Sequence, residues 1–166
     1  MLKSGTVNDA FGISSSDISR SSDSEYEYFK RTYSDDKYED LRDYKLYCFN
    51  GVPDCVLVCS KRGQTEHGAE YYFFDKDWRL KRYNKRGKEA PVDFTLPKPK
   101  GIEKLFDYAA ILSKPFPFVR ADFYLEKGKV TFGELTFTPC GGFDVNRLPE
   151  TQLRFGKMVD LSSIEK

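Results

Sequence analysis

Two strand–turn–strand patterns constrain the fold of this chain more than any other feature. In the first, residues 43–50 (DYKLYCFN) alternate as a β-strand does, and Asn50-Gly51 closes the run. Residues 54–60 (DCVLVCS) then form a second run that is rich in β-branched side chains. Asn-Gly is the commonest two-residue turn of a β-hairpin, so we predict an antiparallel hairpin from 43–50 and 54–60.

The second pattern comprises residues 118–125 (FVRADFYL) and 129–137 (KVTFGELTF), which meet at Lys127-Gly128. On the first strand Arg120 and Asp122 share one face, because successive side chains alternate across a sheet. The side on which Glu134 lies depends on the register, since a slip of one residue moves every side chain to the other face.

A two-residue turn pairs Glu126 with Lys129 and sends Asp122 and Glu134 to opposite sides of the sheet. A three-residue connection pairs Glu126 with Val130 instead. Asp122 then lies opposite Glu134, and Arg120 lies opposite Thr136. Matching of the hydrophobic faces favours the three-residue connection, and Gly128 suits the left-handed residue that such a loop needs.

The favoured register places the Cβ atoms of Asp122 and Glu134 about 5 Å apart on one face. Two carboxylates so close repel each other unless a positive charge lies between them. A divalent cation is one interpretation, since oxygen ligands suit Mg²⁺ or Mn²⁺. A shared proton, or the guanidinium of Arg120, is the other.

The rest of the chain predicts a mixture of further strands and helices. The expected elements are a strand at Glu70–Phe74, a turn at 75–78 with Trp78 as a core anchor, a connection over 81–100, a helix from Gly101 to Ser113 and a helix from Pro149 to about Leu161 with Leu153 and Val159 facing inward. We therefore expect an α+β fold in two layers, with a mainly antiparallel sheet and packed helices. Residues 1–40 are expected to be poorly ordered or partly helical, and 41–166 to form the domain.

Composition argues against several functions. The chain has 27 Lys and Arg against 26 Asp and Glu, so its net charge of +1 gives no field to attract nucleic acid. No apolar run reaches the roughly 18 residues of a membrane span, and no signal peptide is visible. The four cysteines lack zinc-ligand spacing, which leaves a site from Cys55, Cys59 and His67 poorly supported. We expect reduced thiols and a cytoplasmic location.

A different metal motif is formed by Asp75 and Asp77, which follow an apolar strand as a DxD pair. Such pairs bind the metal and the nucleotide sugar in glycosyltransferases of capsule or exopolysaccharide synthesis. Asp75 can equally end a strand as a turn residue. A parallel, doubly wound sheet near residue 75 would favour the glycosyltransferase hypothesis, whereas an antiparallel sheet would count against it.

Three motifs together resemble the TupA-like ATP-grasp family of polysaccharide and teichuronopeptide biosynthesis. RADFY at 120–124 with GELTFTPCGG at 133–142 resembles the metal-binding hairpin of its C-terminal part. DYKLYCFNG at 43–51 and the aromatic-Asp-x-Asp-Trp run at 72–78 resemble two further elements, in the same order. The resemblance covers about residues 41–160 and implies the C-terminal lobe of an ATP-grasp fold.

The resemblance implies a ligase that uses Mg²⁺ (or Mn²⁺) and ATP to activate a carboxylate and join it to an amine on a glycan or peptide. Asp122 and Glu134 would be metal ligands, and Thr136 stands where related ligases usually carry a third ligand, Asn. Arg120 would stabilise the transferred phosphoryl group. Lys45 and Arg62 would contact phosphate or substrate.

The resemblance does not extend to a first lobe with phosphate-binding lysines and a glycine-rich flap, because residues 1–40 show neither. It therefore implies a partial ATP-grasp protein that a complementary N-terminal lobe on another chain would complete. A non-catalytic remnant is the remaining alternative.

Overall fold

The computed structural model of the protein describes residues 42–60, 69–126 and 128–162. Its elements in chain order are β1 (Asp43–Phe49), β2 (Val52–Ser60), β3 (Glu70–Phe74), β4 (Leu80–Lys81), α3 (Lys85–Glu89), α4 (Ile102–Ser113), β5 (Phe118–Glu126), β6 (Lys129–Thr136), the 3₁₀ turn η2 (Pro139–Gly142) and α5 (Pro149–Met158). The prediction that residues 1–40 are poorly ordered or partly helical concerns a segment outside the described residues.

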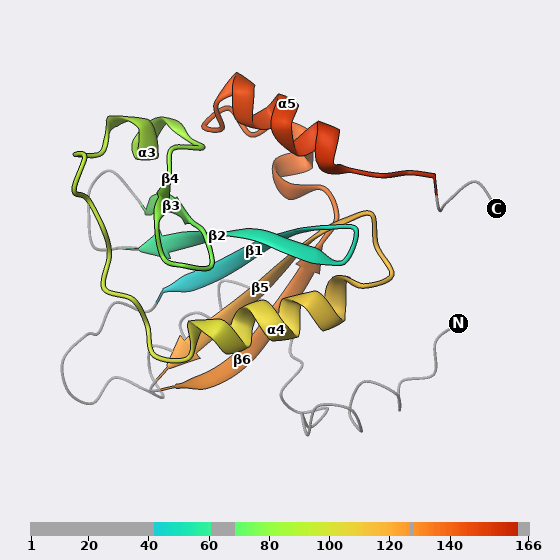
Figure 1. The fold of residues 1–166 in the computed structure, drawn as a ribbon, viewed down its shortest axis with the longest axis horizontal. Helices are drawn as coiled ribbons and strands as arrows, with labels where there is room; N and C mark the ends of the chain where they lie inside the picture. Colours follow the sequence, from blue (N-terminus) through green and yellow to red (C-terminus); the bar gives the residue numbers. More distant parts are fainter. Residues whose placement is uncertain (1–41, 61–68, 127, 163–166) are drawn as a thin grey trace.

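The strands form one six-stranded sheet in the order β4-β3-β2-β1-β5-β6, and every neighbouring pair is antiparallel (Figure 1). This arrangement confirms the predicted α+β class with a mainly antiparallel sheet. The first predicted hairpin is confirmed as β1 and β2. Asn50 and Gly51 join them with φ angles of 51° and 81°, as a primed two-residue turn requires.

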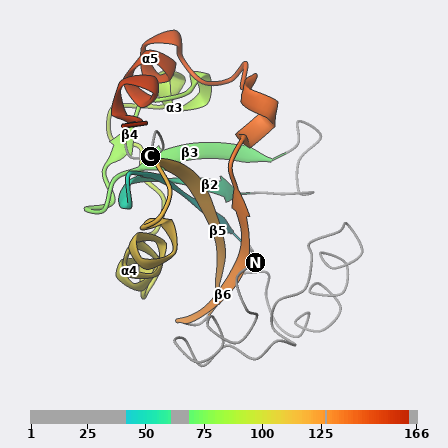
Figure 2. The same cartoon turned by 90° about the vertical axis from the view of Figure 1, so that its right-hand side faces the viewer.

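One face of the sheet packs against α4, which lies alongside the strands in Figure 2. The alternation of β1 explains this face, since Tyr44, Leu46 and Cys48 all point into the same buried cluster. From the helix, Ile102, Leu105 and Ala109 fill that cluster at the spacing of a helical stripe.

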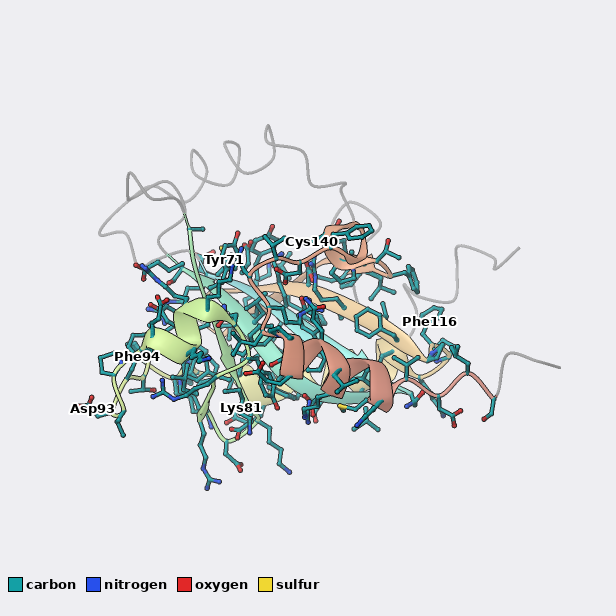
Figure 3. The ribbon with its side chains drawn as sticks, turned by 90° about the horizontal axis from the view of Figure 1, so that it is seen from above. Tyr71, Lys81, Asp93, Phe94, Phe116 and Cys140 are labelled. Carbon is teal, nitrogen blue, oxygen red and sulfur yellow. The ribbon has the colours of Figure 1, made fainter. Side chains whose placement is uncertain are left out.

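The opposite face is covered in part by α5, which lies over the sheet together with α3 when the molecule is seen from above (Figure 3). Phe155 of α5 packs against Tyr47 and Phe49 of β1 and against Phe73 of β3. Leu153 is 62% exposed, so the expectation that it faces inward is wrong. Thr151 and Phe155, four residues apart, form the buried stripe instead.

The segment 81–100 is more structured than expected, because it contains the short helix α3. The side chain of Asn84 caps this helix by accepting a hydrogen bond from the Gly87 N–H at 2.9 Å. Its amide also donates to the Tyr71 carbonyl at 2.9 Å, which ties the cap to β3. The helix therefore depends on a contact between segments distant in sequence as well as on a local cap.

Trp78 is confirmed as a core anchor. Its ring stacks on Phe74 at 4.6 Å, and its indole N–H donates to the Leu96 carbonyl at 2.7 Å. Among the described residues no helix has both the length and the apolar character needed to cross a membrane.

Candidate functional site

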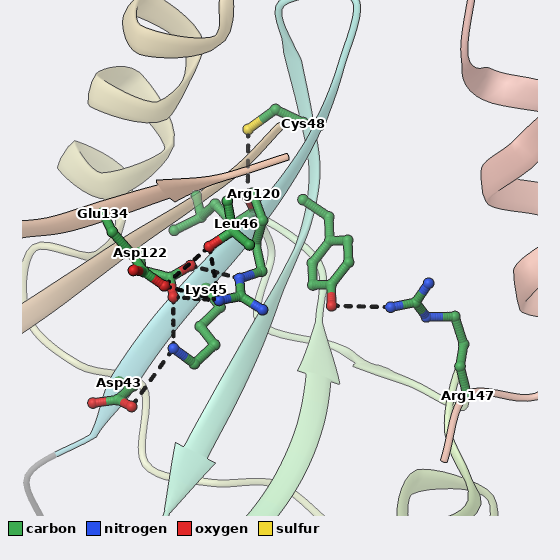
Figure 4. Close-up of polar contacts among 10 residues, drawn as sticks. Asp43, Lys45, Leu46, Cys48, Arg120, Asp122, Glu134 and Arg147 are labelled. Atoms are coloured by element: carbon green, nitrogen blue, oxygen red, sulfur yellow. Dashed lines mark hydrogen bonds and ion pairs between the residues drawn. The ribbon is translucent and has the colours of Figure 1, made fainter. Parts of the chain in front are cut away.

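The neighbouring strands β1 and β5 bring three of the predicted site residues together on the α5 side of the sheet. Lys45 lies directly opposite Asp122 in the register, and its Nζ donates to Asp122 Oδ2 at 2.6 Å. Arg120, two residues before Asp122, donates from Nε and Nη2 to the two carboxylate oxygens, both at 2.7 Å. Asp122 therefore binds two cations at once, with only 7% of its side chain exposed (Figure 4).

The register of β5 and β6 combines the two alternatives that the sequence offered. Next to the turn Glu126 pairs with Lys129, so the expected pairing of Glu126 with Val130 is wrong. Farther along, Arg120 pairs with Thr136, as predicted. The difference arises from a register shift between Ala121 and Phe123, where two residues of β6 oppose the single residue Asp122.

This β-bulge brings Glu134 to the side of the sheet that carries Asp122. Nη2 of Arg120 lies 3.4 Å from Glu134 Oε1 and 2.7 Å from Asp122 Oδ2. Gly133 makes the bulge feasible, because a Cβ atom at that position would lie 3.1 Å from the backbone oxygen of Asp122. The two carboxylates therefore share one face even though the turn has only two residues.

Thr136 completes the group on β6. Its hydroxyl accepts from Nη2 of Arg120 at 3.0 Å and lies 3.0 Å from Glu134 Oε1, to which it can donate. The Glu134 side chain is 52% exposed, in contrast to the buried Asp122. The cluster is therefore open to a ligand on its β6 side.

The charges of this cluster balance, with Lys45 and Arg120 against Asp122 and Glu134. The sequence left open whether a divalent cation, or instead a proton or Arg120, lies between the two carboxylates. The structure places the Arg120 guanidinium there. The pKa of Arg120 is raised: burial lowers it, but the hydrogen bond and charge of Asp122 outweigh burial.

The described residues contain no group of three or more His, Cys, Asp or Glu that could hold a metal ion. The oxygen donors present are two carboxylates and one hydroxyl, a set that suits a hard cation completed by water and phosphate oxygens.

The sequence also raised other candidate residues. Arg62 and His67 lie outside the described residues, and Cys55 and Cys59 are free, buried thiols. Near Asp75 the sheet is antiparallel, which counts against the glycosyltransferase hypothesis.

Asp75 has a local role in the turn that follows β3. Its Oδ1 accepts from the N–H groups of Asp77 and Arg79 at 3.0 and 2.9 Å. This carboxylate thus serves the turn, as the simpler interpretation of the sequence held.

Three residues of the site were not singled out from the sequence. Asp43 lies 3.7 Å from Lys45 Nζ, and the Tyr47 hydroxyl accepts from Arg147 Nη2 at 3.1 Å. Alternation along β1 could have identified Asp43 and Tyr47, which share the face of Lys45. Arg147 has no such signal, because it reaches the site from a loop a hundred residues away.

Two hollows of about 410 and 360 Å³ lie elsewhere on the molecule. The first follows α5, and the second lies between α5, the start of β2 and the turn after β3. Neither is lined by a residue of the carboxylate cluster, so the chemistry of the cluster, and not a deep cavity, identifies the candidate site.

Comparison with known proteins identifies the family of the chain. The family model described as TupA-like ATPgrasp matches residues 12–159, a span that includes all the elements described above and begins within the segment 1–40. No curated protein and no solved structure matches the chain. The match covers most of the chain, and the chain therefore belongs to the TupA-like ATP-grasp family.

Proposed function

We propose that the chain takes part in the ATP-dependent activation of a carboxylate, which an amine then converts into an amide. The observation that supports this most directly is the pair Asp122 and Glu134 on one side of the β5–β6 hairpin, with Arg120 between them. Membership of the TupA-like ATP-grasp family supports binding of a nucleotide.

In this proposal Asp122 and Glu134 hold Mg²⁺ or Mn²⁺, and the Thr136 hydroxyl lies beside them as a further oxygen donor. The metal ion would neutralise charge on the ATP phosphates. Arg120, held by Asp122 next to Glu134, would stabilise the charge that develops on the transferred phosphoryl group. Lys45 orients the Asp122 carboxylate through its 2.6 Å contact.

The substrates follow from the reaction class. We propose a carboxylic acid and an amine, at least one of them attached to a glycan or peptide destined for the cell surface, with the reaction in the cytoplasm. ATP-grasp enzymes hold the nucleotide between two lobes. The proposal therefore includes a complementary lobe that carries phosphate-binding lysines and closes over the β1–β5–β6 side of the sheet.

Isothermal titration calorimetry with Mg·ATP tests the proposal. Replacing Asp122→Asn and Glu134→Gln keeps the shapes of the side chains but removes both charges, so we expect the Mg²⁺-dependent part of nucleotide binding to be lost. Asp54→Asn is the matched control. Asp54 also accepts two hydrogen bonds from one guanidinium, that of Arg154, but lies away from the cluster.

Unchanged Mg·ATP affinity in the double variant would contradict the metal site. Failure of the unmodified chain to bind any nucleotide, alone or with a separately expressed ATP-grasp first lobe, would favour the non-catalytic remnant. A loss of affinity in the Asp54→Asn control as large as in the double variant would point to damage of the sheet, not to a metal site.

A further inference from the structure

Tyr47 lies next to the candidate site but has no part in the proposed chemistry so far. It is directly opposite Arg120 in the pairing of β1 with β5, so the two side chains are neighbours on one face. The residue is only 1% exposed. Its hydroxyl accepts a hydrogen bond from Arg147 Nη2, and the Arg147 guanidinium also stacks over the Tyr47 ring at 5.2 Å.

The phenol oxygen of Tyr47 thus lies between two guanidinium groups. Burial raises the pKa of Tyr47, while the charges of Arg147 and Arg120 act in the opposite direction. The phenol is neutral at physiological pH, and its oxygen can accept hydrogen bonds without an ionic charge of its own. The pKa of Arg120 is raised in part by its interaction with the Tyr47 hydroxyl, after the larger effects of burial and Asp122, so the phenol oxygen faces Arg120 as well as Arg147.

Arg147 itself is held firmly. Its Nη2 donates to Asp144 Oδ2 at 3.2 Å, and its guanidinium stacks over Phe155 at 5.3 Å. Its backbone forms an isolated bridge with Asn84, which links it to the cap of α3. Tyr47 therefore rests against a fixed group on the side away from Arg120.

We propose that Tyr47 and Arg147 are positioning residues that hold the Arg120 guanidinium in its fork on Asp122. This inference rests on the proposed function, because it assigns the two residues to the arginine that acts in that reaction. The fork fixes Arg120 on the side of Asp122, and the Tyr47 hydroxyl fixes it on the side of β1. Arg147 in turn prevents the Tyr47 side chain from moving away.

The arrangement also ties a loop to the site. Thr136 at the end of β6 contacts Arg120, and Arg147 at the far end of the loop contacts Tyr47. Between them lie Cys140, Gly141 and Gly142, all with positive φ. A shift of this loop would therefore disturb Arg120 through Thr136 at one end and through Arg147 and Tyr47 at the other.

The test measures hydrogen exchange of the Arg120 Nε–H by NMR, because this proton is bound to Asp122 Oδ1. We expect Tyr47→Phe and Arg147→Gln each to speed its exchange about tenfold, the factor associated with loss of one typical hydrogen bond. Arg147→Lys, which keeps the charge and can still donate to Tyr47, should restore most of the protection.

The chain offers matched controls in Tyr83→Phe and Arg154→Gln. Arg154 stacks over the Tyr83 and Phe155 rings at 5.2 and 5.8 Å, so this pair copies the packing of Tyr47 and Arg147 without contacting Arg120. These variants should leave Arg120 exchange unchanged. Exchange in Tyr47→Phe and Arg147→Gln that is as slow as in the unmodified chain would overturn the positioning role, as would equal acceleration by the controls.

Calorimetry with Mg·ATP on the same variants separates this inference from the proposed function. If the unmodified chain binds Mg·ATP, Tyr47→Phe should weaken binding about tenfold, and Tyr83→Phe should not. If the unmodified chain binds no nucleotide, either alone or with a separately expressed first lobe, the proposed function fails, but the Arg120 exchange rates still decide whether Tyr47 and Arg147 position the guanidinium.

Discussion

Two aspartates of the sheet hold an arginine in similar forks, yet only one of them lies at the candidate site. Asp122 binds Nε and Nη2 of Arg120, and Asp54 binds Nη1 and Nη2 of Arg154. Asp122 also accepts from Lys45, and its arginine reaches a second carboxylate. The neighbours of an ion pair, and not the pair itself, therefore distinguish a site from a structural contact.

Cys48 illustrates at the same scale how burial alters chemistry. Burial raises the pKa of the Cys48 thiol to about 12, and a hydrogen bond with Ser113 only partly opposes this shift. The thiolate is therefore favoured much more in the unfolded chain, whose thiol has a pKa near 9. The stabilising contribution of Cys48 is complete below that value and is lost as the pH rises toward 12.

We predict that the free energy of unfolding falls between pH 7.5 and pH 10.5, with Cys48 contributing about 2 kcal/mol to the fall. Urea titrations at the two pH values measure the difference for each variant. Cys48→Ala should reduce the fall, and Cys140→Ala, at an exposed position, should not. An identical pH dependence in Cys48→Ala and the unmodified chain would show that Cys48 is not responsible.

At the scale of elements, the bulge in the β5–β6 hairpin decides whether the site exists. The turn at Gly128 sets a register that would separate Asp122 from Glu134, and the extra residue in β6 reverses the sides of the strand beyond it. Glycine at position 133 allows this, because a Cβ atom there would lie only 3.1 Å from the Asp122 carbonyl oxygen.

We predict that Gly133→Ala destabilises the protein by about 1 to 3 kcal/mol, because the added Cβ presses on backbone that cannot move aside easily. Gly156→Ala is the matched control. Gly156 lies within α5 and has no atom within 4 Å of an added Cβ, so alanine there should stabilise by about 0.5 to 1 kcal/mol. Urea unfolding measures both changes.

The same pair of variants separates stability from function. Gly133→Ala should also weaken Mg·ATP binding, whereas Gly156→Ala should leave it unchanged. Normal stability and normal binding in Gly133→Ala would show that the hairpin tolerates a different register.

At the scale of the whole molecule, the sheet has two faces with different tasks. The face toward α4 is a continuous apolar cluster, whereas the face toward α5 is apolar at one end and carries the charged cluster at the other. Helix α5 therefore covers only the apolar end and leaves Glu134 exposed. Docking of α5 also fixes Arg147 through Phe155.

We predict that Phe155→Ala lowers the free energy of unfolding by about 3 to 5 kcal/mol, because the Phe155 ring packs against Tyr47, Phe49 and Phe73. Leu153→Ala, on the exposed side of the same helix, should change it by no more than about 0.5 kcal/mol. Thermal and urea unfolding measure both. Similar losses in the two variants would mean that α5 docks through a different face.

The sequence by itself determined the elements whose signals are local. Alternation and Asn50-Gly51 defined the first hairpin, and the apolar stripe defined α4. Three motifs in order, at 43–51, 72–78 and 120–142, indicated the family. It missed α3, and of the two residues expected to face inward from α5, Val159 packs against the core but Leu153 does not. Both errors arise because these features depend on which surfaces of the sheet remain free to be covered.

Only the tertiary structure decided the register of the site and its partners. Lys45 meets Asp122 across 77 positions of the chain, and Arg147 meets Tyr47 across 100. A bulge placed Glu134 on the side of Asp122, although the turn alone would have placed it on the other. Periodicity along a strand predicts which face of the sheet each of its residues takes. Register depends on how all the strands pack together, so it cannot be predicted from one strand alone.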